Sequence, residues 1–253
     1  MTVSPWIEHA RVLLDAVEAQ TEAIEATSRV CADAIAGDGL VHVFGTGHSR
    51  IPVEELFPRY GSYPGFHPLV ELSMTFHTQV VGANGQRQAM FIERVEGLAK
   101  AILDNFVLRP SDALIVFSHS GINAVPVEMA MIGKEHGLSV IAVTSLAQNG
   151  ASKPVHPSGT RLVDHADIVL DLATPDGDAL VEVEGFPAPI GPGSSLSAIA
   201  IANAVKVRTA QMLAEKGISL PVISRQGATD DGEDLFEQAY AEHARRLAAV
   251  LRT

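Results

Sequence analysis

The chain has 253 residues, 47% of them hydrophobic, which is enough to bury the core of one α/β domain with helical additions. Thirty acidic residues against 18 basic ones give a formal net charge of −12, which argues against nucleic acid or an anionic membrane as a partner. No apolar run approaches the roughly 20 residues of a membrane span, and the first residues lack a signal-peptide pattern, so we expect a cytoplasmic protein.

A long amphipathic helix is predicted for the first part of the chain. Serine and proline at Ser4-Pro5 suit a helix start, and apolar residues then recur every three or four positions as far as Ile35. Glycines at 37 and 39 end this pattern, so we expect one helix over about 5–36. The single cysteine, Cys31, lies on its apolar face, which predicts a core position and excludes an internal disulfide.

The first strand, loop and helix come next. Leu40 to Phe44 is a short apolar run typical of a buried strand, and a helix is expected from about Ser49 to Arg59. Between them lies a loop rich in glycine and hydroxyl groups, formed by Gly45, Thr46, Gly47, His48 and Ser49. A dinucleotide fingerprint would need a third glycine that is absent here, so an anion-binding loop is the better interpretation. Gly61 to Pro68 is predicted to be an ordered loop.

A second unit of the same kind is predicted further along the chain. Leu114 to Phe117 is again an apolar strand, followed by a Ser118-His119-Ser120-Gly121 loop, a helix ending at Gly137 and a strand from Ser139 to Val143. Parallel strands joined by right-handed crossovers bring both loops to the carboxyl edge of the sheet. Serine hydroxyls and the start of a helix suit an anion such as a phosphate ester.

The remaining elements are predicted from spacing and composition. Apolar residues at helical spacing indicate one helix from about Gln88 to Phe106. Leu146 to Thr160 is polar with two prolines and is expected to be a loop over the sheet edge, and Asp167 to Leu172 to be a strand. Ser194 and Ser195 lead into an apolar helix to Lys216, and Leu235 to Leu251 is expected to be a terminal helix.

These loops carry a family resemblance. The segment Phe117 to Asn123 resembles the Ser-x-Ser-Gly-x-Ser/Thr signature of the sugar isomerase (SIS) domain family, with Asn123 in place of the last hydroxyl, and Val43 to Ser49 is similar to its Gly-x-Gly-x-Ser loop. The stretch around Gly191 to Ser195 looks like a little-characterised phosphosugar-binding subfamily near the phosphoheptose isomerases. The resemblance covers nearly the whole chain.

The resemblance implies a three-layer αβα sandwich with a mainly parallel sheet of flavodoxin-like topology. We therefore expect residues 1–253 to form a single SIS domain, with an N-terminal helical extension over about 5–36 and a C-terminal helical tail over about 230–252. A small-molecule sugar phosphate is the expected ligand. A homo-oligomer, either dimer or tetramer, is expected because similar proteins pair their sites at subunit interfaces. The substrate-binding residues implied are Gly45, Thr46, Gly47, Ser49, Ser118, Ser120, Gly121, Asn123, Ser145, Ser194 and Ser195.

Candidate catalytic residues follow from the chemistry of an aldose–ketose isomerase, which needs a base beside the carbonyl and an acid for the neighbouring oxygen. Where phosphoheptose isomerases carry a functional His and Glu, counted from Ser49, this chain has Glu55 and Arg59. Glu54 and Glu55 lie one turn beyond the first loop, and only one of two neighbouring helix positions would face the pocket. They are the candidate bases, and plain solvent exposure is the alternative.

Two histidines lie inside the predicted ligand loops. His48 and His119 could act as acid or base near neutral pH, or could hold the loops by hydrogen bonds alone. No HxxxH or HxH spacing supports a metal, and we expect no cofactor. We therefore expect a phosphosugar-binding protein that isomerises a sugar phosphate or amino-sugar phosphate. A non-catalytic phosphosugar sensor and an etherase-type lyase on an amino-sugar phosphate are the alternatives.

Overall fold

A computed structural model describes residues 4–75, 85–224 and 234–252 of the chain. Its centre is a five-stranded parallel sheet with the strand order β2-β1-β3-β4-β5. This is the flavodoxin-like order, so the predicted fold class is confirmed. The strands are β1 (Val41–Gly45), β2 (Phe66–Leu69), β3 (Ala113–Phe117), β4 (Ser139–Thr144) and β5 (Ile168–Asp171).

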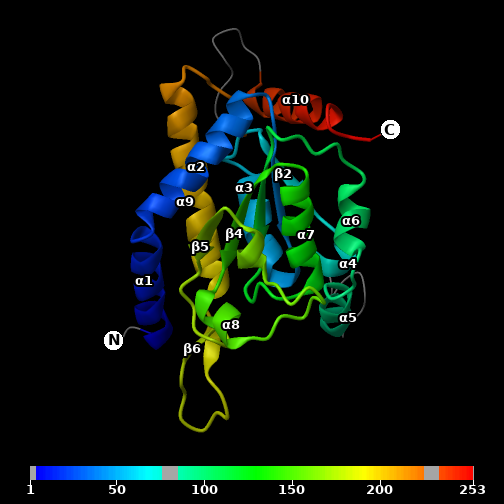
Figure 1. The fold of residues 1–253 in the computed structure, drawn as a ribbon. Helices are drawn as coiled ribbons and strands as arrows, with labels where there is room; N and C mark the ends of the chain where they lie inside the picture. Colours follow the sequence, from blue (N-terminus) through cyan, green and yellow to red (C-terminus); the bar gives the residue numbers. More distant parts are fainter. Residues whose placement is uncertain (1–3, 76–84, 225–233, 253) are drawn as a thin grey trace.

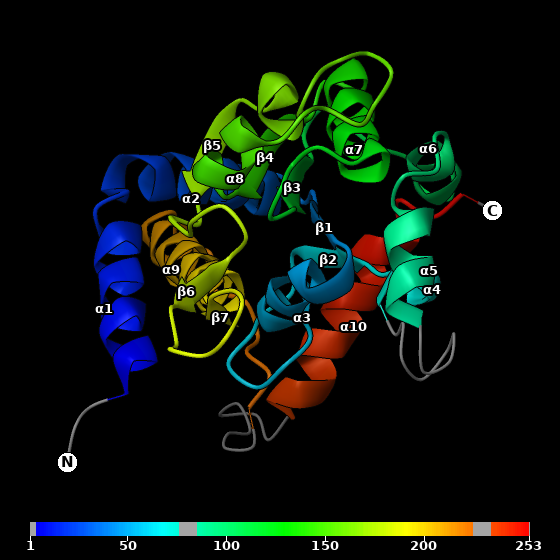
Figure 2. The same cartoon turned by 90° about the horizontal axis from the view of Figure 1, so that it is seen from below.

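Helices cover both faces of this sheet (Figures 1 and 2). One face packs against α2 (Thr21–Ala36), α3 (Ile51–Leu56) and α9 (Ser194–Glu215). The other face packs against α6 (Leu98–Leu103) and α7 (Ala124–Glu135). Every residue of β1 and β3 is buried, which explains why these strands are continuous apolar runs in the sequence.

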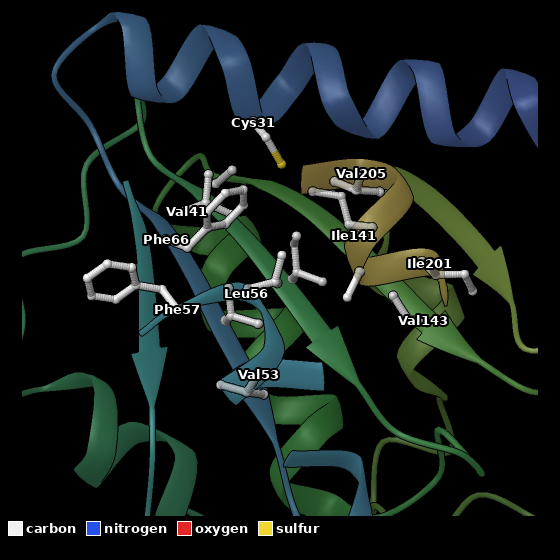
Figure 3. Close-up of a cluster of buried hydrophobic side chains, with 14 of the residues drawn as sticks. Cys31, Val41, Val53, Leu56, Phe57, Phe66, Ile141, Val143, Ile201 and Val205 are labelled. Carbon is white, nitrogen blue, oxygen red and sulfur yellow. The ribbon is translucent and has the colours of Figure 1, made fainter. Parts of the chain in front are cut away.

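The core on the first face is drawn in Figure 3. Cys31 of α2 points between the sheet and α9, where it is fully buried, and burial raises the pKa of its thiol to about 12. Val41 and Ile141 come from the sheet, and Val205 and Ile201 from α9. The cysteine is therefore an inert core residue, as its place in the apolar pattern predicted.

The N-terminal helix is broken, which corrects the single helix expected over 5–36. The structure has α1 (Pro5–Glu18) and α2, separated at Ala19 and Gln20. The Gln20 side chain donates to the Asp171 carbonyl at 2.8 Å and accepts from the Asp171 N–H at 2.7 Å. The hydrogen bonds of Gln20 to the edge strand β5 thus fix the break between the two helices. The apolar spacing continues across the break, so it gave no sign of it.

Three other expectations are also corrected. The predicted loop 61–68 ends in β2, an edge strand that tolerates Pro68 because no ladder hydrogen bond is required there on one side. The helix expected over 88–106 is two helices, α5 (Gly85–Ile92) and α6, separated at Gly97, which has a φ of +80° and whose N–H binds the Glu128 carboxylate at 2.9 Å. The predicted loop 146–160 begins with α8 (Leu146–Ala151), capped by Ser145.

The remaining elements lie at the two ends of the sheet. Beyond the strands' carboxyl ends, β6 (Ala179–Val181) and β7 (Ile190–Pro192) form an antiparallel hairpin, low in Figure 1, and we call residues 174–192 the arm. The helix α10 (Leu235–Ala248) lies at the opposite end. Residues 230–233 of the expected tail fall outside the described ranges. The short helices are η1 (Gly47–Arg50), α4 (Leu72–Thr75) and η2 (Leu162–His165). Within the described ranges no helix could cross a bilayer.

A buried polar cluster occupies the amino edge of the sheet. His42 of β1 and His67 of β2 are register partners, and their Nδ1 atoms are 2.9 Å apart. The His42 Nε2 atom lies 3.7 Å from the Asp112 carboxylate, and the His67 ring packs edge-on against Phe106 at 4.9 Å. His243 of α10 completes the cluster, with its ring centroid 6.4 Å from that of His67. His42 and His67 are both buried, so this cluster holds titratable groups inside the protein.

Candidate functional site

A cavity of about 420 Å³ lies at the carboxyl edge of the sheet, where the loops that follow β1 and β3 meet. Its walls come from both predicted ligand loops, from α5, from the arm and from the start of α9. The lining residues are Thr46, Gly47, His48, Ser49, Gln86, Ala89, Met90, Glu93, His119, Asp178, Pro192, Ser194 and Ser195. Seven of the residues predicted from the sequence are thus brought to one cavity.

The first loop turns sharply after β1. A Cβ atom at Gly45 would lie 2.2 Å from the Ser49 carbonyl oxygen, so only glycine allows the chain to fold back this closely. The Ser49 N–H then donates to the Thr46 carbonyl at 2.9 Å, which begins η1. Gly47 has a φ of +54° with open space around it. The two glycines therefore serve different purposes, close approach at Gly45 and a left-handed backbone at Gly47.

The different surroundings of Gly45 and Gly47 predict different losses of stability when a methyl group is added at each position. Gly45→Ala is expected to destabilise the protein by about 3 kcal/mol, because backbone atoms must move to admit the methyl group. Gly47→Ala is the matched control and should cost about 1–2 kcal/mol, since only its positive φ opposes a side chain. Thermal denaturation of both variants measures the difference. Equal melting temperatures for the two would contradict the close approach at Gly45.

The second loop lies beside the first. Ser118 accepts a hydrogen bond from the Gly121 N–H at 3.2 Å, and Gly121 has a φ of +63°. Ser118 also lines a narrow hollow of about 10 Å³ together with His48, Ser49, Ser194 and Ser195. The hydroxyl groups of the two loops therefore face a common space, as the βαβ topology predicted.

Glu93 joins the two loops, although no motif in the sequence around it indicates a role in the site. Its Oε2 atom accepts a hydrogen bond from the Thr46 hydroxyl at 2.8 Å, and its Oε1 atom accepts one from the Asn123 amide at 2.7 Å. Burial raises the pKa of Glu93 above its usual value, and the Thr46 hydrogen bond acts in the opposite direction. Glu93 is therefore a cavity carboxyl whose proton affinity is increased and whose position both loops fix.

His119 contributes a second titratable group to the cavity. Its Nε2 atom lies 3.0 Å from the Thr174 hydroxyl and 3.8 Å from the Asp178 carboxylate. Burial lowers the pKa of His119, while the charges of Asp178 and Asp176 oppose this shift. The imidazole is consequently neutral at pH 7. His48, from the first loop, lines the same cavity.

The start of α9 is already occupied by a carboxylate. Asp178 of the arm accepts hydrogen bonds from the Gly193 N–H at 3.1 Å, the Ser194 N–H at 2.8 Å and the Ser194 hydroxyl at 2.6 Å. It therefore satisfies two backbone N–H groups at this helix end, those of Gly193 and Ser194. The sequence predicted Ser194 as a ligand for the substrate, but here its hydroxyl binds Asp178.

Several predicted residues lie outside the cavity lining. Ser145 is fully buried, where it caps α8 and donates to the Thr174 carbonyl at 2.7 Å. The Ser120 carbonyl accepts from Asn149, and Asn123 holds Glu93. Gly45 and Gly121 shape the backbone of the loops. These residues support the site rather than line it.

Glu54 and Glu55 are not in the cavity, which corrects their predicted position. They line a different pocket of about 670 Å³ that shares no lining residue with the first. Glu54 pairs with Arg50 at 2.8 Å, and Glu55 pairs with Arg59 and accepts from Asn203. The reason is that α3 begins only after η1 and buries Val53 and Leu56, while Glu54 and Glu55 form ion pairs with Arg50 and Arg59.

No group of three or more His, Cys, Asp or Glu side chains within residues 4–75, 85–224 and 234–252 could hold a metal ion. The cavity itself is lined by hydroxyl, carboxyl and imidazole groups. A carboxyl of raised pKa opposite a neutral imidazole suits proton transfer to and from a bound molecule.

Comparisons with known proteins give the family. A family model described as SIS domain matches residues 5–145. A UPF0309 protein from Streptomyces coelicolor is 36% identical over 230 residues, which cover 90% of this chain and 89% of the relative. Two solved structures share the fold. A phosphoheptose isomerase from Francisella tularensis has a TM-score of 0.52 at 17% identity over 83% of this chain and 100% of that chain. Phosphoheptose isomerase GmhA from Neisseria gonorrhoeae has a TM-score of 0.50 at 13% identity over 80% and 94%.

Proposed function

We propose, because this chain belongs to the SIS domain family, that it binds a sugar phosphate in the cavity at the carboxyl edge and interconverts its aldose and ketose forms. The volume of about 420 Å³ is in the range of small-molecule sites. Glu93 carries the proposal, since this carboxyl of raised pKa lines the cavity and is held by both ligand loops. Two solved structures that share this fold are phosphoheptose isomerases, and their names support a sugar phosphate as the substrate class.

The phosphate is assigned to the hydroxyl groups where the two loops meet. Ser49 lines both the cavity and the narrow hollow that Ser118 also lines, so a phosphate in the cavity would lie at the mouth of this hollow, where hydroxyl donors suit phosphate oxygens. The start of α9 is not assigned to the phosphate, because Asp178 occupies its N–H groups and would repel a second anion. The sugar would then extend from the hollow toward Glu93.

Isomerisation needs two proton movements. Starting from the aldose, the Glu93 carboxylate takes the proton from C2, the C–H electron pair forms the C1–C2 double bond, and the C1–O1 π pair moves onto O1 to give an enediolate. His119 takes the proton of the O2 hydroxyl and passes it to O1, and the O2 lone pair then forms the C2–O2 double bond of the ketose. Glu93 then delivers its proton to C1, which gives the ketose and regenerates both side chains. A base whose pKa is raised toward the working pH performs this exchange efficiently.

A thermal-shift panel followed by an exchange assay tests the proposal. Sugar phosphates at about 1 mM are expected to raise the melting temperature, and a ligand at 100 times its Kd adds about 2.7 kcal/mol of stability. The free sugars and inorganic phosphate are the controls, and Ser118→Ala with Ser120→Ala should remove the shift. The bound sugar phosphate is then incubated with protein in D2O, where proton NMR is expected to show deuterium at C1 or C2.

Each other outcome identifies an alternative. A shift without deuterium exchange and without conversion would indicate a phosphosugar sensor. Release of a carboxylic acid from an ether on an amino-sugar phosphate would identify a lyase. A panel without any shift would contradict the assignment of a sugar phosphate to this cavity.

A further inference from the structure

We infer that Thr174 and Asp178 are positioning residues that hold the proton of His119 on Nε2 and so assign proton transfer to Nδ1. The inference rests on the proposed proton transfer by His119, and it adds which nitrogen acts and which residues decide this. The contacts come from the arm segment after β5, which is distant in sequence from both ligand loops.

Both groups near Nε2 can accept a hydrogen bond from an N–H at this position. The Thr174 hydroxyl oxygen is 3.0 Å from Nε2, and the Asp178 carboxylate is 3.8 Å from it. A neutral imidazole places its hydrogen on the nitrogen that faces an acceptor, and its other nitrogen then carries the lone pair. This arrangement corresponds to the orientation of a catalytic imidazole by a buried acceptor on its far side.

Thr174 is held rigidly in relation to the His119 loop. Its side chain is 1% exposed, and its carbonyl accepts from the Ser145 hydroxyl at 2.7 Å. The Ser145 N–H and the Thr144 hydroxyl in turn both donate to the His119 carbonyl at 3.0 Å. The threonine and the histidine are thus tied to the same end of β4, so their hydrogen bond does not depend on a bound ligand.

Asp178 is fixed with equal firmness. Three hydrogen bonds anchor its carboxylate at the start of α9, and its backbone has a φ of +66°, which non-glycine residues rarely adopt. The Asp178 carboxylate is thus held near Nε2, where it stabilises the imidazolium that forms when Nδ1 takes a proton.

The other charged groups around His119 act on the same equilibrium. Asp176 belongs to the same arm segment and also favours the imidazolium, and His48 and Glu93 line the cavity from the first loop and from the end of α5. Burial favours the neutral ring. Of the two arm carboxylates, Asp178 is the one in contact with the His119 ring. Its charge should therefore raise the pKa of His119 more than that of Asp176 does.

The test is a pH titration of the ligand-free, full-length protein by two-bond ¹H–¹⁵N NMR of the His119 ring. We expect the Nε2–H tautomer at pH 8. Asp178→Asn should lower the pKa of His119 by about one unit, and the asparagine oxygen can still cap α9. Asp176→Asn is the matched control and should shift this pKa less. Thr174→Val should mix the tautomers, and Thr174→Ser should restore Nε2–H.

Two results would overturn the inference: an Nδ1–H tautomer in the natural protein, or a His119 pKa that Asp178→Asn leaves unchanged in a folded variant. Circular dichroism and the melting temperature establish that each variant is folded. The NMR measurement needs neither substrate nor turnover, so a failure of the proposed isomerase activity would be seen separately, in the deuterium exchange assay.

Discussion

Glu93→Gln is expected to lower kcat by about 10²–10⁴-fold, because glutamine cannot accept the proton from the sugar carbon. The substitution keeps the size of the side chain, and the glutamine oxygen can still accept from Thr46 or Asn123. We therefore expect KM and the melting temperature to change little. Steady-state kinetics with the sugar phosphate that gives the thermal shift measures the effect, and deuterium exchange in D2O should fall in parallel.

Matched variants separate the base from other carboxylates. Glu96→Gln changes an exposed residue of the same segment and should leave kcat unchanged. Glu54→Gln and Glu55→Gln alter the carboxylates of the separate pocket and should also retain full turnover. Retention of more than a tenth of kcat in Glu93→Gln would remove Glu93 as the base, and a large loss in Glu55→Gln would restore the assignment made from the sequence.

Acid should destabilise the protein through the histidine cluster at the amino edge. Burial, together with the nearby His42 and His243, lowers the pKa of His67 to about 3, against 6.5 for an ordinary histidine. Below pH 6.5 the unfolded chain therefore binds a proton that the folded protein refuses. The free energy of unfolding then falls by up to about 1.4 kcal/mol per pH unit for this residue, or about 2 kcal/mol between pH 6.5 and 4.5.

The pH range from 6.5 to 4.5 lies above the range in which Asp112, the carboxyl group of the same cluster, titrates. Burial alone would raise the pKa of Asp112. The neighbouring His42 ring, the Leu40 N–H and the Arg109 side chain instead lower this pKa to about 2. The stabilisation by ionised Asp112 is present above pH 3.8 and is lost as the pH falls toward 2. His119 and His243, whose pKa values burial lowers, add to the slope above pH 4.5.

Denaturant unfolding at several pH values from 7 to 4.5 measures this slope. His67→Phe should reduce it by up to about 1.4 kcal/mol per pH unit, even though the variant is less stable at every pH because it leaves His42 without its partner at Nδ1. His136→Gln, at an exposed position, should leave the slope unchanged. An unaltered slope in His67→Phe would show that the imidazole is protonated normally in the folded state.

Local patterns predicted the elements that bury apolar runs. β1, β3 and the helix α7 follow from continuous hydrophobic segments bounded by turn residues, and the loops after these strands carry the recognisable serines and glycines. Breaks in helices were missed where a distant group fixes them. Gln20 bonds a strand 151 residues away, and the Gly97 N–H binds Glu128. The spacing of apolar residues within one segment cannot indicate hydrogen-bond partners that lie far away in the sequence.

The site shows the same limit. Glu93 becomes significant only because Thr46 and Asn123, 47 and 30 residues away, converge on it. Its own neighbourhood is the end of a short helix with no motif. Asp178 likewise belongs to a turn that the sequence identifies, but its contact with α9 depends on how the arm folds back. The sequence therefore predicts where ligands bind more reliably than which carboxyl performs the chemistry.

The packing of α2 against α9 also bears on how the chain is made. Cys31 and Ile35 of α2 belong to the same buried core as Val205 and Ile201 of α9, which begins 158 residues after α2 ends. At about 5–20 residues per second, a ribosome needs roughly 8–32 s to synthesise the intervening chain. During that time the apolar side of α2 lacks its covering helix. We therefore expect chaperones to bind mainly to nascent chains in which α2 has left the ribosome and α9 has not yet been made. A pause in translation before residue 194 would lengthen this period.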